Sequence, residues 1–108
     1  MNMGEMEQIV FGIISSVGMA KSSYVEAMRA ASAGKFEEAE AKMKEGDEYY
    51  AKGHDIHVDL VQKEAAGEYL SPGLLLIHAE DQMMSAELVR LMAEENIKLN
   101  KRIQELEK

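Results

Sequence analysis

The sequence predicts an all-α fold, an antiparallel up-down-up bundle of three helices in a single domain that spans residues 1–108. Two observations support this class. Apolar residues recur at spacings of three and four along three long segments, and the alternation typical of strands is nowhere sustained. The composition agrees, because one proline, no tryptophan and abundant Ala, Glu, Lys and Met favour helices.

The first segment is defined by one apolar stripe that ends at a glycine. Ser32-Ala33-Gly34 interrupts the pattern and places Gly34 as a glycine C-cap. The stripe that predicts the helix consists of Met6, Ile9, Val10, Ile13, Val17, Ala20, Tyr24, Ala27, Met28 and Ala31.

The second segment contains two glycines on its apolar stripe and closes at Gly67. Each mid-helix glycine costs roughly 1 kcal/mol relative to alanine. Gly46 and Gly53 are seven residues apart on one face, so either close helix approach compensates or the helix breaks. The stripe comprises Phe36, Ala39, Met43, Gly46, Tyr50, Gly53, His57, Leu60 and Glu64.

The third segment predicts a helix from residue 72 to residue 106, a rod of about 50 Å at 1.5 Å per residue. Ser71 suits the N-cap and Pro72 the first helical position. Two apolar seams share Asp81 and Leu88 on this helix. One seam reads Leu74, His78, Asp81, Ser85, Leu88, Met92, Glu95, Leu99, Arg102, Leu106, and the other Ile77, Asp81, Met84, Leu88, Leu91.

This apolar arc is wider than one neighbouring pair of helices needs. Three helices also form a thin core, so the surplus arc suggests self-association. We expect a symmetric oligomer with Asp81 close to its axis.

Composition excludes several function classes. The formal net charge of −8 disfavours nucleic acid and anionic membrane surfaces, both of which need clustered cations. The absence of cysteine excludes disulfides, thiolate zinc sites and a cysteine nucleophile. No stretch approaches the ~18 apolar residues of a membrane span, so we expect a cytoplasmic protein without direct membrane insertion.

Function is expected at the octapeptide from Ile77 to Met84, where His78 and Asp81 lie three residues apart on an apolar helix face. Burying such groups is unfavourable unless they are paired, metal-bound or reactive. A core histidine with its hydrogen bonds satisfied and an aspartate that fixes oligomer register are the structural alternatives. His54 and His57 resemble a metal pair, but without cysteine or a Glu-x-x-His partner, surface and core roles are favoured.

The octapeptide Ile77-His78-Ala79-Glu80-Asp81-Gln82-Met83-Met84 resembles the signature His-Ala-Gln-Asp-His-Leu-Met of the lactose/cellobiose class of Enzyme IIA components of the bacterial sugar phosphotransferase system. Gly18-Met19-Ala20-Lys21-Ser22 resembles that family's Gly-x-Ala-Arg-Ser motif. Residues 33–39 resemble its first turn and residues 74–77 its lead-in to the active helix. The likeness covers nearly the whole chain.

The resemblance implies a homotrimer of three-helix bundles, with a nine-helix coiled-coil-like core. It implies that His78 accepts a phosphoryl group from the histidine phosphocarrier protein and passes it to a cysteine of Enzyme IIB, for uptake of a β-disaccharide of the lactose, cellobiose or chitobiose type through the membrane component Enzyme IIC. It further implies that Asp81 binds a divalent metal at the trimer axis. Mg²⁺ completed by water suits converging carboxylates, and partial protonation is the alternative.

Three positions depart from the family pattern. Glu80 replaces the usual Gln, and its carboxylate would repel a phosphohistidine unless screened or turned away. Gln82 replaces a second His found in many members, and its amide can still donate a hydrogen bond to a phosphoryl group on His78. Met19 stands where Asp is common.

Two functions of different class therefore compete. The leading one is a phosphohistidine carrier, for which a neutral imidazole with a free nitrogen at cellular pH is suited. The alternative is a non-catalytic helical oligomeric or regulatory module in which His78 and Asp81 only set packing register. A metal-storing bundle is set aside because the Glu-x-x-His pairs of di-iron bundles are missing.

Overall fold

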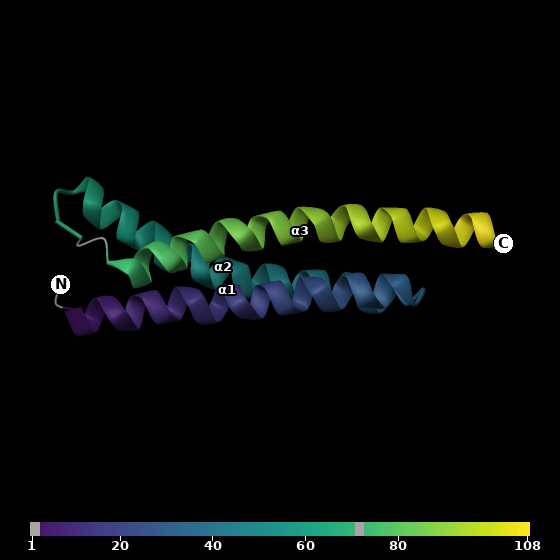
Figure 1. Cartoon of the computed structure of the whole chain (residues 1–108), viewed down its shortest axis with the longest axis horizontal. Helices are drawn as coiled ribbons and strands as arrows, with labels where there is room; N and C mark the ends of the chain where they lie inside the picture. The colour runs from purple at the N-terminus through teal and green to yellow at the C-terminus, as the bar shows by residue number, and fades with distance from the viewer. Residues whose placement is uncertain (1–2, 71–72) are drawn as a thin grey trace.

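Three long antiparallel helices make up the structure, a computed structural model that describes residues 3–70 and 73–108. They are α1 (Met3–Ser32), α2 (Phe36–Ala65) and α3 (Leu74–Glu107). The bundle is a rod of 59 × 20 × 19 Å, with α1 and α3 running in one direction and α2 in the other (Figure 1). The predicted up-down-up, all-α architecture is confirmed.

Both connections contain a glycine in the left-handed region, as the sequence predicts. Gly34 has φ +78° and Gly67 has φ +93°, conformations that other residues rarely adopt. After α1, the Lys35 amide donates to the carbonyl of Ala30 at 2.9 Å. The Glu68 amide makes the equivalent bond after α2. Such bonds satisfy carbonyls that a helix end leaves unpaired, so each glycine ends its helix.

α3 begins later than predicted. Its N-cap is Gly73, in an extended conformation with φ −73° and ψ 165° and without a side-chain cap. The first helical residue is Leu74 rather than residue 72. A glycine has the weakest helix propensity of any residue except proline, which suits a boundary position. The roles predicted for Ser71 and Pro72 fall on residues outside those that the structure describes.

The two mid-helix glycines allow α2 to approach α1 closely. A β-carbon placed on Gly46 would lie 2.5 Å from Cε1 of Tyr24, and one on Gly53 would lie 3.0 Å from Cγ2 of Val17. α2 is continuous through both positions. Close approach, and not a break, therefore compensates for the two glycines.

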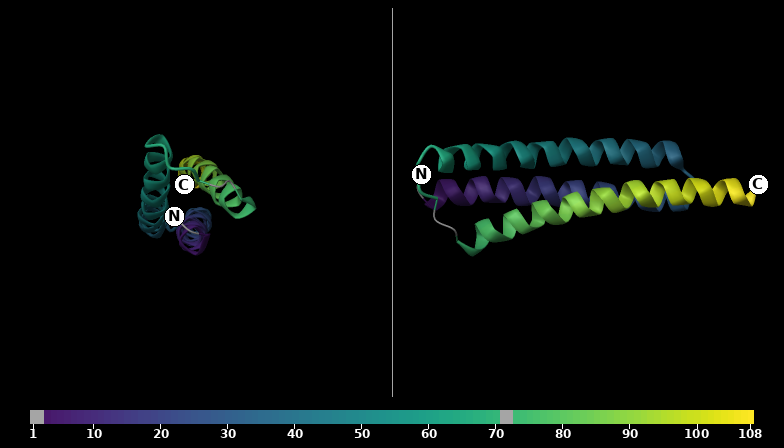
Figure 2. Two further views of the ribbon diagram at one scale, coloured as in Figure 1. Left: turned by 90° about the vertical axis from the view of Figure 1, so that its left-hand side faces the viewer. Right: turned by 90° about the horizontal axis from the view of Figure 1, so that it is seen from above.

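α1 is the central helix of the core. Most of its predicted stripe is buried, with Ile13, Val17, Ala20 and Tyr24 fully so. α2 and α3 both pack against α1 and contact each other much less. The end view shows α3 diverging from α2 at its N-terminal end (Figure 2). No helix within residues 3–70 and 73–108 is long and apolar enough to cross a membrane.

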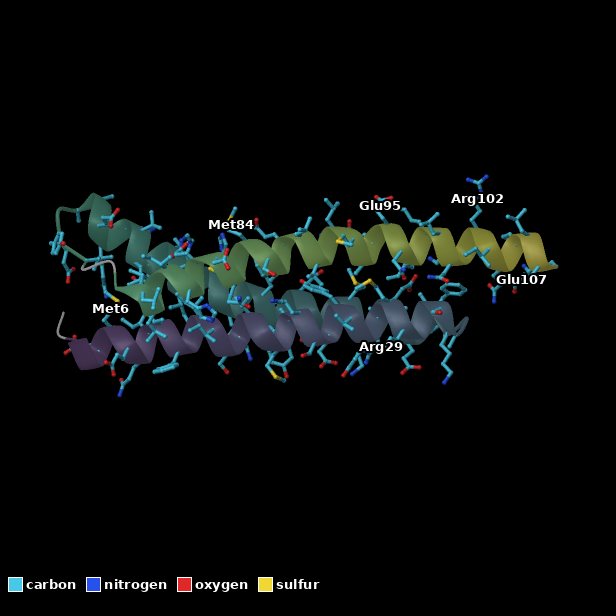
Figure 3. The ribbon with its side chains drawn as sticks, in the orientation of Figure 1. Met6, Arg29, Met84, Glu95, Arg102 and Glu107 are labelled. Atoms are coloured by element: carbon cyan, nitrogen blue, oxygen red, sulfur yellow. The ribbon has the colours of Figure 1, made fainter. Side chains whose placement is uncertain are left out.

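Most of the large apolar residues of α3 face outward, which the seams alone did not reveal. The buried face of α3 consists of three alanines, Ala79, Ala86 and Ala93, together with Met83 and Ile97. Small side chains let the helix backbones approach. In Figure 3, Met84, Glu95 and Arg102 point away from the other helices. The outer face of α3 exposes Leu74, Ile77, Asp81, Met84, Leu88, Leu91, Met92, Leu99, Ile103 and Leu106.

A polar cluster links all three helices near the middle of the rod. The buried Tyr24 hydroxyl on α1 donates to Oδ1 of Asp47 on α2 at 2.7 Å. Nε of Arg90 on α3 donates to the same oxygen, also at 2.7 Å. Burial alone would raise the pKa of Asp47, but the hydrogen bonds from Arg90 and Tyr24 outweigh it and lower that pKa. The cluster fixes how each helix is rotated about its axis.

Candidate functional site

His78 lies on α3 one turn after the helix begins, and its side chain is exposed. It makes no hydrogen bond or ion pair with the part of the chain that the structure describes. A core histidine with its hydrogen bonds satisfied would be buried and paired, so the geometry disfavours that alternative. An accessible imidazole can meet a reactive group on another protein.

Asp81 lies on the outer face of α3, on the side opposite the buried Ala79 and Met83. Its exposed carboxylate has no partner among residues 3–70 and 73–108, while its neighbours Ile77 and Met84 are exposed apolar side chains. No group of three potential metal ligands occurs within the described part of one chain. A metal bound through Asp81 would therefore need ligands from further copies.

Gln82 is tied to α1. Nζ of Lys21 donates to Oε1 of Gln82 at 2.9 Å across the contact between α1 and α3. This bond orients the Gln82 amide with its oxygen on Lys21, so its nitrogen stays available as a donor. Gln82 follows His78 by four residues, which places the two on one side of α3. We call this side, with His78 and Gln82, the α1 flank of α3.

Glu80 is directed to the other side. Its Oε2 lies 2.8 Å from Nε2 of His57 on α2, a close polar contact between the carboxylate and the imidazole. The two side chains are 42% and 27% exposed, respectively, so the contact is partly shielded from water. We call this side of α3 its α2 flank. Glu80 is therefore turned away from His78 of the same chain, one of the two conditions that the sequence left open.

Two further residues contact the predicted site without having been assigned a role in it. Lys21 belongs to a motif quoted for the family resemblance, but nothing in its spacing indicates that it reaches Gln82. The sequence singled out His57 as one half of a possible metal pair with His54 and as a polar residue on the apolar stripe of α2, with surface and core roles favoured. In both cases the sequence shows only a polar residue beside a core position. Its partner on another helix can be identified only when the rotation of each helix about its axis is known.

The other candidates lie apart from these contacts. His54 is exposed on α2, with its ring 6.1 Å from that of Tyr50 and 6.5 Å from that of His57. Met19, at the position where the family often has Asp, is 46% exposed on α1.

Comparisons with known proteins give a consistent family assignment over most of the chain. The family model described as "PTS system, Lactose/Cellobiose specific IIA subunit" matches residues 8–101. The lichenan-specific phosphotransferase enzyme IIA component of Bacillus subtilis (strain 168) is 44% identical over 101 residues, which covers 94% of this chain and 92% of that protein.

Solved structures agree. The crystal structure of the cellobiose-specific Enzyme IIA from Bacillus anthracis superposes with a TM-score of 0.90 at 38% identity, covering 96% of this chain and 94% of that one. IIA(Chitobiose) in its complex with HPr from Escherichia coli gives a TM-score of 0.79 at 28% identity, covering 91% and 95%.

Proposed function

This chain belongs to the lactose/cellobiose-specific IIA family of the sugar phosphotransferase system, and on that basis we propose that His78 is its phosphoryl acceptor. Members of this family are phosphotransferase components. The chain would receive the phosphoryl group from the histidine phosphocarrier protein, HPr, and pass it to a cysteine of Enzyme IIB. The solved complex of a chitobiose IIA protein with HPr supports this choice of upstream partner.

The observation that carries the proposal is the environment of His78. The imidazole is exposed, unpaired within the described chain, and shares the α1 flank with a cation and an amide donor. In the transfer, the P–N bond of the carrier breaks as a P–N bond forms on His78, and the group later leaves for the thiolate of Enzyme IIB. Such steps depend mainly on positioning and on stabilisation of charge.

Lys21 and Gln82 can supply that stabilisation. A phosphoryl group on His78 adds about two negative charges to a chain whose net charge is already −8. Lys21 offers the ammonium charge, and the amide nitrogen of Gln82 can donate to a phosphoryl oxygen. Both groups are held by their mutual hydrogen bond before the phosphoryl group arrives, which limits the ordering that transfer requires.

Assembly as a homotrimer through the outer face of α3 is part of the proposal. Most of the exposed large apolar side chains of the chain lie on α3, and a single copy leaves them in water. A contiguous apolar face of this kind marks an interaction surface. Three copies packed through it would form the nine-helix core that the family resemblance implies.

Asp81 suits a shared divalent metal in such a trimer. Its carboxylate stands without a partner among the described residues, in an apolar surround, so packing three copies through this face would bring three charges together. Carboxylate oxygens are the ligands that hard cations such as Mg²⁺ prefer. The metal would neutralise these charges and serve assembly, while the phosphoryl chemistry stays with the side chains on the α1 flank.

The transported sugar is proposed as a β-disaccharide of the lactose, cellobiose or chitobiose type, in line with relatives named for cellobiose and lactose. The carrier itself exchanges phosphoryl groups with proteins and has no need to contact the sugar. We place the chain in the cytoplasm as part of this proposal, since a carrier between HPr and Enzyme IIB must meet both proteins.

One experiment tests the assignment. The protein is incubated with phosphoenolpyruvate, Enzyme I and HPr, and acid-labile phosphate is measured on the wild type, His78→Ala and His54→Ala. His54 is an exposed histidine outside the proposed site and is the matched control. We expect label on the wild type and on His54→Ala but none on His78→Ala. Label that persists on His78→Ala would refute the assignment.

A further inference from the structure

His57 on α2 makes a contact with Glu80 that the transfer described above does not use. Nε2 of the imidazole lies 2.8 Å from Oε2 of the Glu80 carboxylate, and both side chains are partly shielded from water. Glu80 directly precedes Asp81 and stands two residues from His78. The contact therefore fixes the position of a negative charge close to the residue that carries the phosphoryl group.

Within one chain this charge points away from His78. Successive helical residues are rotated by about 100°, so residues two apart do not face each other. His78 lies on the α1 flank of α3, beside Gln82, and Glu80 lies on the α2 flank. Asp81 stands between them on the outer face. Repulsion between Glu80 and a phosphoryl group on the same chain is weakened by this separation.

In a threefold assembly, His78 of one copy can lie close to Glu80 of the next copy, although the two residues are separated within one chain. In a cyclic trimer each interface is heterologous, so one side of a subunit packs against the opposite side of the next subunit. If Asp81 faces the axis, the α1 flank of one α3 borders the α2 flank of the next. From Asp81 on the outer face towards the α2 flank, α3 presents Ile77 and Met84, which are 55% and 66% exposed, and then Glu80. Each His78 thus shares a groove with Glu80 of the next copy.

A free carboxylate in that groove would oppose phosphorylation. A phosphoryl group brings about two negative charges, and a nearby like charge disfavours them, more strongly where water is excluded. The contact with Nε2 of His57 holds the Glu80 carboxylate against α2 and engages one of its oxygens.

We propose that His57 is a positioning residue for phosphoryl transfer, which ties Glu80 to α2 and so keeps its charge away from the phosphoryl group on His78 of the next copy. This inference rests on the proposed function and its trimer. It gives different expectations from a purely structural role, in which the His57–Glu80 contact would only join two helices.

A double-mutant cycle separates the two roles. The full-length wild type, His57→Ala, Glu80→Gln and the double variant are phosphorylated with phosphoenolpyruvate, Enzyme I and HPr, and the transfer rate and the fraction phosphorylated at equilibrium are measured. We expect His57→Ala to slow transfer about tenfold, as a freed carboxylate approaches a dianion in partly screened surroundings. Glu80→Gln alone should match or exceed the wild type.

The double variant is decisive. We expect it to recover to within about twofold of Glu80→Gln, because the charge that His57 restrains is gone. A double variant as slow as His57→Ala, or a His57→Ala protein as fast as the wild type, would overturn the inference. His57→Gln keeps a donor and should stay close to the wild type, and a urea midpoint measured for each variant shows that the compared proteins are folded.

Mixed trimers test whether the effect crosses between copies. His57→Ala chains are assembled with an excess of His78→Ala chains, so that each reactive His78 borders Glu80 of a chain with intact His57. We expect the transfer rate to return towards that of the wild type. A rate as slow as in pure His57→Ala trimers would place the effect within one chain and overturn the inference. A wild type that is not phosphorylated on His78 would instead refute the proposed function itself.

Discussion

Replacing Gly46 by alanine is expected to destabilise the bundle, although the substitution improves helix propensity. The new β-carbon would stand 2.5 Å from Cε1, 2.7 Å from Cδ1 and 3.0 Å from Cζ of Tyr24. The Tyr24 side chain is fully buried, and its hydroxyl is held by Asp47 at 2.7 Å. The ring therefore cannot move aside without losing that hydrogen bond or without separating α1 from α2.

The expected magnitude follows from three contributions. Alanine in a helix interior gains about 1 kcal/mol over glycine. Overpacking a well-filled core costs about 1–3 kcal/mol. Displacing the Tyr24 hydroxyl from Asp47 costs about 1 kcal/mol more. We therefore expect Gly46→Ala to lower the free energy of unfolding by about 1–3 kcal/mol overall.

Gly18→Ala provides a matched control within the same fold. Gly18 lies in α1 and is exposed, and a β-carbon added to it would meet nothing within 4 Å apart from its chain neighbours and the adjacent helix backbone. There the propensity gain acts alone, so stability should rise by about 0.5–1 kcal/mol. Equilibrium urea unfolding followed by circular dichroism, at one fixed protein concentration, measures both variants. A Gly46→Ala midpoint at or above that of the wild type would refute the close-approach reasoning.

Three further predictions concern the site, the polar cluster and assembly. Lys21→Met should slow phosphoryl transfer from HPr about tenfold, the loss expected for one charge-assisted hydrogen bond. Lys21→Arg, which keeps the charge, and Lys52→Met, which changes an exposed lysine elsewhere on the surface, should transfer at rates close to that of the wild type. A Lys21→Met protein with the wild-type rate would show that Lys21 has no role in the site. Asp47→Asn should cost about 1 kcal/mol at pH 7. Folding lowers the pKa of Asp47, so its carboxylate stabilises the folded state fully above the unfolded pKa of about 4, and this stabilisation is lost as the pH falls through the folded pKa. The urea midpoints of the wild type and Asp47→Asn should therefore converge in acid. A gap between the two midpoints that stays constant with pH would contradict this reasoning. Asp81→Leu should still sediment as a trimer, and a chelator should not change its sedimentation, since the substitution removes the charges that a metal would neutralise. Monomeric Asp81→Leu would instead show that metal binding is the main contribution to trimer stability.

The elements of this fold could be predicted from the sequence where the signal was local. The glycines that end α1 and α2 stand at the predicted positions, because a left-handed residue is needed there and glycine adopts it readily. The sequence predicts a start for α3 at residue 72, whereas the first helical residue that the structure describes is Leu74, after the N-cap Gly73. Boundaries of this kind depend on how the neighbouring helices are spaced.

The direction of the α3 seams could not be predicted from the pattern alone. Leucine and methionine at helical spacing indicate a core face, yet in the single chain the buried positions of α3 are mainly alanines such as Ala79, Ala86 and Ala93. Periodicity locates an apolar face without saying which surface covers it. Here the approach of α3 to α1 selects small side chains, and the large ones remain for contacts beyond the chain.

The pairings of Lys21 with Gln82 and of His57 with Glu80 join helices that are far apart in sequence, so spacing within a motif could not reveal them. Together they show why an acidic residue is tolerated beside the proposed nucleophile. α3 separates the charges by face, since its α1 flank contacts the cation Lys21 of α1 and its α2 flank bears the carboxylate of Glu80. A substitution that rotated α3 about its axis would mix these surroundings. The Tyr24–Asp47–Arg90 cluster opposes that rotation, and it therefore contributes to the electrostatics of the site as well as to the stability of the bundle.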